Sequence, residues 1–190
     1  MVDSPQELWQ TYDERGEPLA GVSLTKQQAR QGALHAAAHV WIWRGQGAGI
    51  EILLQRRARD KQTWPGHLDI SAAGHIRFGE TPLLAAIRET AEELALAVKP
   101  EDLRLLFVHR MNVQVTGTEM VENEFQWIYA VKMAEVDDTR LPESEVESLA
   151  WVSIREFKQL VLPPPRQQQK DRVVPHGRGY FVTLLEALAP

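Results

Sequence analysis

The sequence predicts an α/β fold, an α/β/α sandwich built on a mixed β-sheet, and two observations support this prediction. Runs rich in β-branched and aromatic residues, bounded by glycine and proline, recur along most of the chain. After Pro82, in contrast, apolar residues follow helical spacing. Strands and helices that succeed one another in this order are typical of a mixed sheet covered by helices.

The length and composition fit one domain. The chain has 190 residues, of which 44% are hydrophobic, so it can bury a sizeable core. We expect a single domain over residues 1–190. It comprises an N-terminal extension with a short hairpin at 1–33, a core that carries the chemistry at 34–160, and a C-terminal linker and helix at 161–190.

In the first half of the chain, alternating and apolar runs predict five strands. Two lie within 8–21, on either side of a turn at Glu14-Arg15-Gly16, and the others span 35–43, 50–56 and 69–73. Residues 25–32 predict a short helix. The loop over 57–69 contains a turn at Trp64-Pro65-Gly66.

A helix beginning at Pro82 is specified by its own residues. Thr81 is a favourable N-cap, and Pro82 at the first helical position loses no N–H that the helix needs. One side of this helix carries an apolar stripe that we expect to pack on the core. The stripe consists of Leu83, Leu84, Ile87, Ala91 and Leu94.

The second half of the chain predicts three further strands and two helices. The strands span 104–114, 121–133 and 149–152, and a loop containing Gly117 joins the first two. The helices span 153–161 and 178–188, with a linker from Pro163 to Lys170 between them.

The most informative segment is 74–96, where a glycine, four carboxylates and a guanidinium stand at fixed spacing. Gly74 is followed after five residues by Glu80, after seven more by Arg88-Glu89, and then by Glu92-Glu93. Glu89, Glu92 and Glu93 leave one face of the helix and repel one another unless solvent or a cation neutralises them. A solvated helix face is the simpler interpretation, but the upstream glycine and glutamate make a chance match rare.

This segment resembles the Nudix box, a motif of the form G-x5-E-x7-R-E-U-x-E-E-x-G-U, in which U is aliphatic. All six glycine and charged positions through Glu93 match. Thr90 stands where an aliphatic residue is usual, and Ala95 stands where the second glycine is usual. Neither change removes a metal ligand, although glycine at the position of Ala95 normally permits a left-handed helix end.

The resemblance implies a Nudix-like fold and metal-dependent hydrolysis of a diphosphate, with Mg²⁺ as the cofactor and Mn²⁺ as an alternative. Arg88 would not act on the substrate but would pair with Glu80 or Glu89 and so order the ligands. The metal ligands that the box implies are the carbonyl of Gly74, Glu89, Glu92 and Glu93, with Glu80 touching metal through water.

Other motifs resemble isopentenyl-diphosphate isomerase and its Nudix relatives. They are LWQTYDERGEPLAG, Leu34-His35, TWPGHLDISAAGH and VENEF, and with the box they extend over residues 8–133. In the isomerase, a cysteine two residues before the histidine of the Gly-His pair carries the proton transfer, and Ala73 occupies that position in this chain. The metal-site positions of the isomerase are present in part as His35, His75, Glu122 and Glu124.

Glu122 and Glu124 lie two residues apart on a predicted strand, so they share one face, opposite Phe125 and Trp127. The residues alone leave two interpretations open, a solvated strand face and a position near the metal centre. The resemblance favours the metal centre, with Glu122 as a ligand. The general base that takes a proton from water is Glu89, Glu122 or Glu124.

Basic residues and histidines are the candidates for substrate contacts. Within the basic cluster at 56–61, Arg57 is the residue that the resemblance places against a diphosphate. His35 and His75 are expected either to support the metal ligands or to contact the substrate. His39, alone on an apolar strand, is interpreted as a core residue.

Composition narrows the class of protein. A net charge of −5 and a pI near 5.7 argue against nonspecific binding to nucleic-acid polymers or membrane surfaces. The absence of cysteine excludes disulfides and thiolate sites and fits a reducing cytoplasm. No apolar run approaches the ~20 residues of a membrane helix, and the segment MVDSPQELW lacks the apolar region of a signal peptide.

Three functions stay open from the sequence. The first is a hydrolase that cleaves a small-molecule diphosphate, either a nucleoside diphosphate linked to a group X or a related organic diphosphate. The second is an isoprenoid-diphosphate isomerase-like enzyme, which Ala73 disfavours. The third is a catalytically silent ligand-binding module, which the intact box carboxylates disfavour. Segments 111–121 and 162–177 are candidates for either the pocket wall or a homodimer interface.

Overall fold

The computed structural model describes residues 7–61, 63–115, 118–141, 146–163 and 172–188. The predicted loop at Gly117 and most of the predicted linker, Pro164–Lys170, lie outside these residues. No helix in the described ranges combines the length and apolar character needed to cross a membrane.

Nine strands are found in the described residues. Two of them, β1 and β2, form a separate antiparallel hairpin, and the other seven form one sheet. The strands are β1 Leu8–Tyr12, β2 Pro18–Thr25, β3 His35–Arg44, β4 Glu51–Arg57, β5 Leu68–Asp69, β6 Ala72–His75, β7 Arg104–Gln114, β8 Val121–Lys132 and β9 Val146–Ser153.

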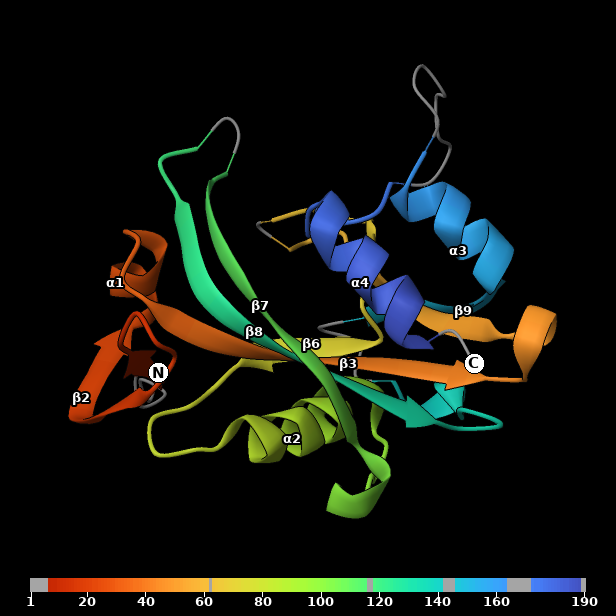
Figure 1. Cartoon of the computed structure of the whole chain (residues 1–190), viewed down its shortest axis with the longest axis horizontal. Coiled ribbons are helices and arrows are strands. Elements are labelled where there is room, and N and C mark those ends of the chain that lie inside the picture. The colour runs from red at the N-terminus through yellow and green to blue at the C-terminus, as the bar shows by residue number, and fades with distance from the viewer. Residues whose placement is uncertain (1–6, 62, 116–117, 142–145, 164–171, 189–190) are drawn as a thin grey trace.

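The seven-stranded sheet is mixed. Its order is β5-β4-β3-β8-β7, with β6 paired to β3 and β9 paired to β4. The pairing between β3 and β8 is parallel, with His35 beside Glu124, while the other pairings of named strands are antiparallel. The predicted mixed sheet is therefore confirmed, with β3 at its centre (Figure 1).

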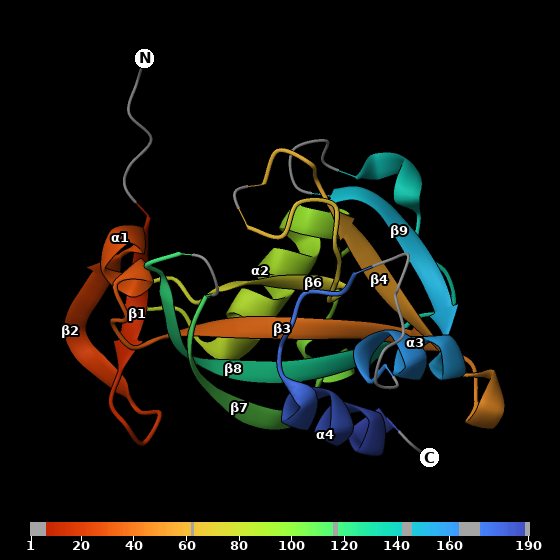
Figure 2. The same ribbon diagram turned by 90° about the horizontal axis from the view of Figure 1, so that it is seen from above.

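Helices cover both faces of this sheet. The α-helices are α1 Lys26–Arg30, α2 Pro82–Leu94, α3 Ile154–Val161 and α4 Arg178–Leu188, and single 3-10 turns lie at Gly47–Gly49, Pro100–Asp102 and Asp138–Arg140. Helix α2 lies on one side of the sheet, and α3 and α4 lie on the other (Figures 1 and 2). This arrangement is the α/β/α sandwich that the sequence predicts.

The alternation of side chains along β3 divides the core into two layers. Ala38 and Val40 face α2 and pack with Ala86 in one buried cluster. Trp41 faces the other way and packs with Tyr180 of α4 in a second cluster. Successive residues of a strand point to opposite faces, so one strand supplies both cores. His35 and His39 are separated from Trp41 by even numbers of residues along β3, six and two, so they share the α4 face of the sheet with Trp41.

The structure corrects the predicted strand at 69–73, which is two strands and not one. β5 ends at Asp69 and pairs with β4, whereas β6 begins at Ala72 and pairs with β3. Ser71, between them, accepts a hydrogen bond from the Ile42 N–H at 2.9 Å and donates one to the Leu53 carbonyl at 2.6 Å. Side-chain bonds to the backbone thus replace strand pairing where the chain crosses from β4 to β3.

Other boundaries differ by a few residues. β2 runs to Thr25 and not to residue 21, and β9 spans Val146–Ser153 and not 149–152. Both extensions are paired along their length, β2 with β1 and β9 with β4, so contacts between distant segments lengthen strands that the local sequence marks only in part.

Helix α2 begins and ends as its sequence indicates, but its predicted apolar stripe is only partly right. Leu83, Ile87 and Leu94 pack on the core, whereas Leu84 and Ala91 are exposed. The Thr81 hydroxyl accepts a hydrogen bond from the Leu84 N–H, which caps the first turn. The buried Thr90 hydroxyl donates to the Ala86 carbonyl at 2.7 Å, so threonine at this usually aliphatic position leaves no unpaired polar group. Ala95 ends the helix in the left-handed region, with φ 54° and ψ 29°.

We expect Ala95→Gly to raise the free energy of unfolding by about 1 kcal/mol, because glycine adopts the left-handed conformation without the steric cost that an L side chain incurs. Urea unfolding followed by circular dichroism measures the change. Ala91→Gly, at an exposed position inside the same helix, is the matched control and should lower stability by ~1 kcal/mol. A loss of stability in Ala95→Gly would contradict the left-handed helix end.

Candidate active site

A cavity of about 1000 Å³ lies beside β3, β6 and β8. Its wall combines carboxylates, histidines and cations from elements far apart in the sequence. The carboxylates are Glu7, Asp60, Asp69, Glu89, Glu93, Glu122 and Glu124, and the histidines are His35, His39, His75, His109 and His176. Nearly every candidate site residue of the sequence analysis thus lies in or beside one cavity.

Arg88 is the centre of the acidic cluster. Its Nε and one terminal nitrogen donate to the two oxygens of Glu80 at 2.9 and 2.8 Å, and the same terminal nitrogen donates to the His75 carbonyl at 2.9 Å. The other terminal nitrogen donates to Glu89 and to Glu92. Arg88 therefore pairs with both Glu80 and Glu89, the two partners that the sequence analysis left open.

Glu89 lies directly against the backbone of Gly74. A Cβ atom on Gly74 would lie 2.1 Å from the Glu89 carboxylate, a separation that no real side chain tolerates. Glycine is required at this position by the close approach of a carboxylate from α2 to the short strand β6. The first and fourth functional positions of the box are thus in contact.

Glu93 lies half-buried between β4 and β6. Its Oε2 accepts hydrogen bonds from the Gln55 amide at 3.0 Å and from the Ala73 N–H at 3.1 Å. Burial, together with the negative charge of Glu89, raises the pKa of Glu93 to about 8. Burial also raises the pKa of Glu89. Both carboxylates are thus costly to keep ionised by themselves, and a divalent cation bound between them would offset that cost.

Glu92 and Glu80 occupy the edge of this cluster. Glu92 is exposed and accepts hydrogen bonds from Arg77 at 3.2 and 3.3 Å as well as from Arg88. Both Glu80 oxygens are engaged by Arg88, and Oε2 also accepts from the Arg77 N–H at 3.0 Å. Glu80 therefore fixes the loop before α2, and its contact with metal through water stays a prediction.

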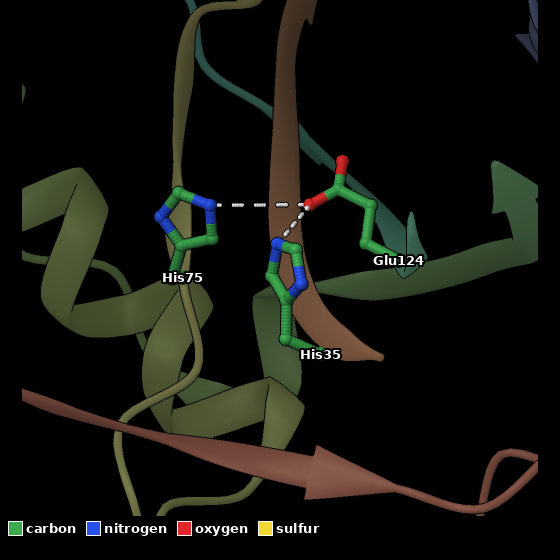
Figure 3. Close-up of side chains that lie close together, drawn as sticks. All are labelled: His35, His75 and Glu124. Carbon is green, nitrogen blue, oxygen red and sulfur yellow. Dashed lines mark ion pairs between the residues drawn. The ribbon is translucent and has the colours of Figure 1, made fainter. Parts of the chain in front are cut away.

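A second cluster, formed by His35, His75 and Glu124, lies on the α4 face of the sheet. The nitrogen and oxygen atoms that these side chains offer lie within 4.8 Å of one another. His35 Nε2 is 3.4 Å and His75 Nε2 is 3.9 Å from the same Glu124 oxygen (Figure 3). The other Glu124 oxygen accepts from the Gln126 amide at 2.6 Å, which fixes the carboxylate.

The hydrogen-bond pattern of His35 favours a cation in this second cluster. His35 Nδ1 donates to the Ala33 carbonyl at 2.8 Å, so Nε2 of the neutral ring carries no proton. Nε2 and the Glu124 oxygen are then two acceptors that face each other, an arrangement that requires a proton or a metal ion between them. The donor set, two imidazoles and one carboxylate, fits a transition-metal dication.

The charges in the second cluster are set by burial and by mutual contact. Burial would raise the pKa of Glu124, but His35 and His75 hold it well below its usual range, so the carboxylate is ionised. Burial lowers the pKa of His75 to about 4, which keeps its ring neutral. Burial would also lower the pKa of His35, but the Glu124 contact raises it. An ionised carboxylate and a neutral imidazole are the forms that bind metals.

The N-terminal hairpin packs on His75. The Trp9 ring is stacked on the His75 ring with centroids 3.6 Å apart and planes 10° apart. The Gln10 N–H donates to the Ile76 carbonyl, and the Phe78 N–H donates to the Leu8 carbonyl. Nothing in the local sequence marked Trp9 for this position, because the contact joins segments about 66 residues apart in the sequence.

Arg57 and Glu122 both line the cavity, outside the two clusters described above. Arg57 lines the cavity, but it donates to Asp69 at 2.9 Å and to the Thr63 carbonyl at 3.2 Å. Glu122 lines the same cavity without joining the cluster around Glu124. Burial, and secondarily the charge of Glu124, raises the pKa of Glu122. The roles of Arg57 in diphosphate binding and of Glu122 in metal binding stay predictions.

The chain is similar to a known protein family and to several of its members. The model of the family described as NUDIX domain matches residues 33–177. Nudix hydrolase 3 of Arabidopsis thaliana is 34% identical over 142 residues, which are 73% of this chain, and the match spans 18% of that protein. An isopentenyl-diphosphate Delta-isomerase of Corynebacterium diphtheriae is 32% identical over 148 residues, covering 77% of this chain and 78% of that protein.

A solved structure shows the same fold. The crystal structure of a MutT NUDIX hydrolase from Burkholderia pseudomallei has a TM-score of 0.54 to this chain at 20% sequence identity. The superposition covers 82% of this chain and 98% of that one. The mixed sheet and its two helical layers are thus shared with that structure.

We expect Gly74→Ala to weaken Mg²⁺ binding by roughly 10- to 100-fold, because the new methyl group must displace Glu89 from Arg88 and from its place in the cluster. Isothermal titration calorimetry measures the affinity. Gly49→Ala is the matched control, since no atom lies within 4 Å of its added Cβ. Equal affinity in Gly74→Ala and the wild type would show that Glu89 holds no metal.

We expect Mg²⁺ affinity to increase with pH up to about 8, because the cation must displace the proton that Glu93 retains below its pKa of about 8. One displaced proton corresponds to a change of up to about tenfold per pH unit below that value. Calorimetry in buffers of different ionisation enthalpy measures the protons released. In Glu93→Gln this proton release should disappear, and its persistence would assign the proton to another group.

Proposed function

Because this chain belongs to the Nudix hydrolase family, we propose that it hydrolyses a diphosphate linkage in a nucleoside diphosphate linked to a group X or in a related organic diphosphate. The observation that carries the proposal is the acidic cluster around Arg88. Three box carboxylates converge there, and one of them fills the space that the missing side chain of Gly74 leaves beside the cavity.

The donor set of this cluster fits Mg²⁺, with Mn²⁺ as an alternative, since oxygen ligands predominate. Glu89, Glu92, Glu93 and the Gly74 carbonyl are the groups that would hold the ion. A divalent cation bound there would polarise phosphoryl oxygens and lower the pKa of water. Arg88 would keep the carboxylates converged against their mutual repulsion through the bonds that it makes in the structure.

The direction in which each carboxyl pKa is shifted favours some of the candidates for the base that takes a proton from the attacking water. Glu124 is held well below its usual pKa range and is already engaged by Gln126 and two histidines, so it is better suited to bind a cation. Burial raises the pKa of Glu89 and of Glu122 toward neutrality, where a base is most effective. We therefore assign the base to Glu89 or Glu122, and pH-rate profiles of Glu89→Gln and Glu122→Gln distinguish them.

The size of the cavity supports a substrate larger than a five-carbon diphosphate. A volume of about 1000 Å³ lies at the upper end of the range for small-molecule sites and accommodates a ligand of nucleotide size. Apolar side chains such as Trp9, Met111 and Val113 share the wall with charged ones. A diphosphate that carries a large organic group would contact both the charged and the apolar side chains of this wall.

An isoprenoid-diphosphate isomerase-like enzyme is the second candidate. The cluster of His35, His75 and Glu124 favours it, because the resemblance to the isomerase implies metal-site positions for these residues and they converge in the structure. Ala73 disfavours it, since an alanine cannot transfer a proton where the isomerase uses a cysteine. A catalytically silent binding module is the third candidate, and the converged carboxylates around Arg88 disfavour it.

We expect the wild type to turn over one class of diphosphate with Mg²⁺ or Mn²⁺, and Glu93→Gln to lose this activity by roughly 100-fold or more while it keeps its fold. Cleavage is followed by chromatography of the phosphorylated products, such as a nucleoside monophosphate and a sugar phosphate from a nucleotide sugar. The substrates are nucleotide sugars, dinucleotides, nucleoside triphosphates and isoprenoid diphosphates. Glu101→Gln, an exposed substitution of the same kind, is the matched control and should keep full activity.

The outcomes separate the three candidates. Metal-dependent cleavage of the diphosphate linkage that Glu93→Gln abolishes identifies the hydrolase. Interconversion of isopentenyl isomers without phosphate release identifies the isomerase. Binding of a diphosphate without either reaction, in a protein that thermal unfolding shows to be folded, identifies the binding module and rejects our proposal.

A further inference from the structure

Trp64 differs from the other tryptophans of the chain because it lies outside the hydrophobic cores. The chain has six tryptophans, and five of them lie in or against one of three hydrophobic clusters. Trp64 belongs to none of the clusters that the described residues form, yet it is half-buried and lines the cavity. The proposed function leaves it without a role. The five core tryptophans are Trp9, Trp41, Trp43, Trp127 and Trp151.

The loop between β4 and β5 holds Trp64 in a backbone conformation that is unusual for its residue type. Its φ is 51°, in the left-handed region, where an L side chain is strained. Within the described ranges, Ala95 is the only other residue besides glycines with a positive φ. Strain of this kind persists only where the surrounding structure imposes it, and it is concentrated at ligand-binding sites and active sites.

Hydrogen bonds from the end of β4 impose this conformation. The Arg57 N–H donates to the His67 carbonyl at 3.0 Å, and the Gly66 N–H donates to the Arg57 carbonyl at 3.2 Å, which closes the loop. The Arg57 guanidinium donates to the Thr63 carbonyl at 3.2 Å, and the Arg56 guanidinium donates to the Gly66 carbonyl at 2.9 Å. Residues on both sides of the tryptophan are thus fixed, so its ring has a fixed place in the cavity wall.

The Trp64 ring has no other ring stacked on it in the part of the chain that the structure describes. His67 contacts it edge-to-face, with ring centroids 5.5 Å apart and planes 64° apart. Trp9, which also lines the cavity, differs because the His75 ring is stacked on it at 3.6 Å. An indole ring accepts a flat partner in an offset stack, and a ligand in the cavity is a partner that the protein itself does not supply for Trp64.

The other residues of this loop that line the cavity are polar. They are Arg57, Asp60, Lys61 and Thr63. An aliphatic chain placed here would bury charged groups against hydrocarbon, which is unfavourable. A nucleobase has a flat face for the indole and polar edges for its charged and hydroxyl neighbours, so it fits both parts of this loop. Apolar side chains of the wall come instead from β7 and β8, at Met111, Val113 and Val121.

The cavity wall has cations besides those of this loop. Lys26, Arg30 and Arg110 line it from α1 and β7. Together with a cation in the acidic cluster around Arg88, their charge would compensate that of a bound diphosphate. Trp64 is therefore suited to contact the organic part of the substrate.

We propose that Trp64 stacks on the base of the substrate and thereby makes the enzyme selective for nucleoside diphosphates linked to a group X over diphosphates that carry an aliphatic group. This inference rests on the proposed function. Stacking of a base on an aromatic side chain increases affinity by roughly 5- to 150-fold, and any base suffices, because every base has a π face. Trp64 is thus a specificity-determining residue, whereas the acidic cluster acts on the diphosphate.

The test compares ligands with and without a base, on the full chain with Mg²⁺. The nucleotide probes are the α,β-methylene analogues of ADP, GDP, CDP and UDP, which resist hydrolysis. The base-free probe is ribose 5-(α,β-methylene)diphosphate, which keeps the sugar and the two phosphorus groups. In calorimetry, Trp64→Leu should weaken the tightest nucleotide probe by roughly 5- to 150-fold and change the affinity for the base-free probe by less than about twofold. Trp64→Phe, which keeps a ring, should lose less affinity than Trp64→Leu.

Phe78→Leu is the matched control, because Phe78 is an exposed aromatic residue that does not line the cavity. It should bind both kinds of probe as the wild type does. Equal losses for the two kinds of probe in Trp64→Leu would assign Trp64 a structural role in the loop and overturn the inference.

A second measurement observes Trp64 in the wild type. In ¹⁵N-labelled protein, the indole N–H signal that Trp64→Phe removes should move upfield with a nucleotide probe, because of the ring current of a stacked base, and should move little with the base-free probe. A wild type that binds no nucleotide probe more tightly than the base-free probe, or a Trp64 signal that responds equally to both, would overturn the inference and leave the proposed function standing. A wild type that binds no probe and cleaves no diphosphate would overturn both.

Discussion

The bonds of one guanidinium hold this site together. Arg88 joins the loop after β6 to helix α2, through Glu80 and the His75 carbonyl on one side and through Glu89 and Glu92 on the other. Carboxylates in a partly buried space repel one another, and each would otherwise require water or a cation. Arg88 supplies part of that compensation in advance and fixes the geometry. The site therefore exists as a shaped acceptor set before any ligand arrives, which lowers the cost of ordering it on binding.

Two clusters of potential metal ligands line the cavity, because adjacent residues of a strand face opposite sides of the sheet. Gly74 faces α2 and receives Glu89, while His75, the next residue, turns to the α4 face and joins Glu124. The acidic cluster consists of oxygen donors and the second cluster is rich in nitrogen donors, so they differ in the cations that they favour. Because β6 has only four residues, both clusters reach the same cavity at its end.

Features set by neighbouring residues could be predicted from the sequence, whereas contacts between distant segments could not. The start of α2 at Pro82 follows from the capping residue Thr81 and the proline itself. The partners of Arg88 were implied by the resemblance to the Nudix box and are found in the structure. The break between β5 and β6 could not be predicted, because the bonds of Ser71 to β3 and β4 decide it. Only the family resemblance predicted that His35 and Glu124 lie close together. The contact between Asp69 and His176, at 3.2 Å, is not indicated by any local pattern in the sequence.

The stacking of Trp9 on His75 has a consequence for where the functional unit begins. The family model starts at residue 33, yet a side chain at residue 9 covers one face of a candidate metal ligand. The region that the family model matches and the set of residues that surround the candidate site are therefore not the same. Relatives that share the box but carry a different N-terminal segment would present a different wall to the same ligands. Exchanging that hairpin would therefore change the surroundings of the cluster of His35, His75 and Glu124 without changing any residue of the box.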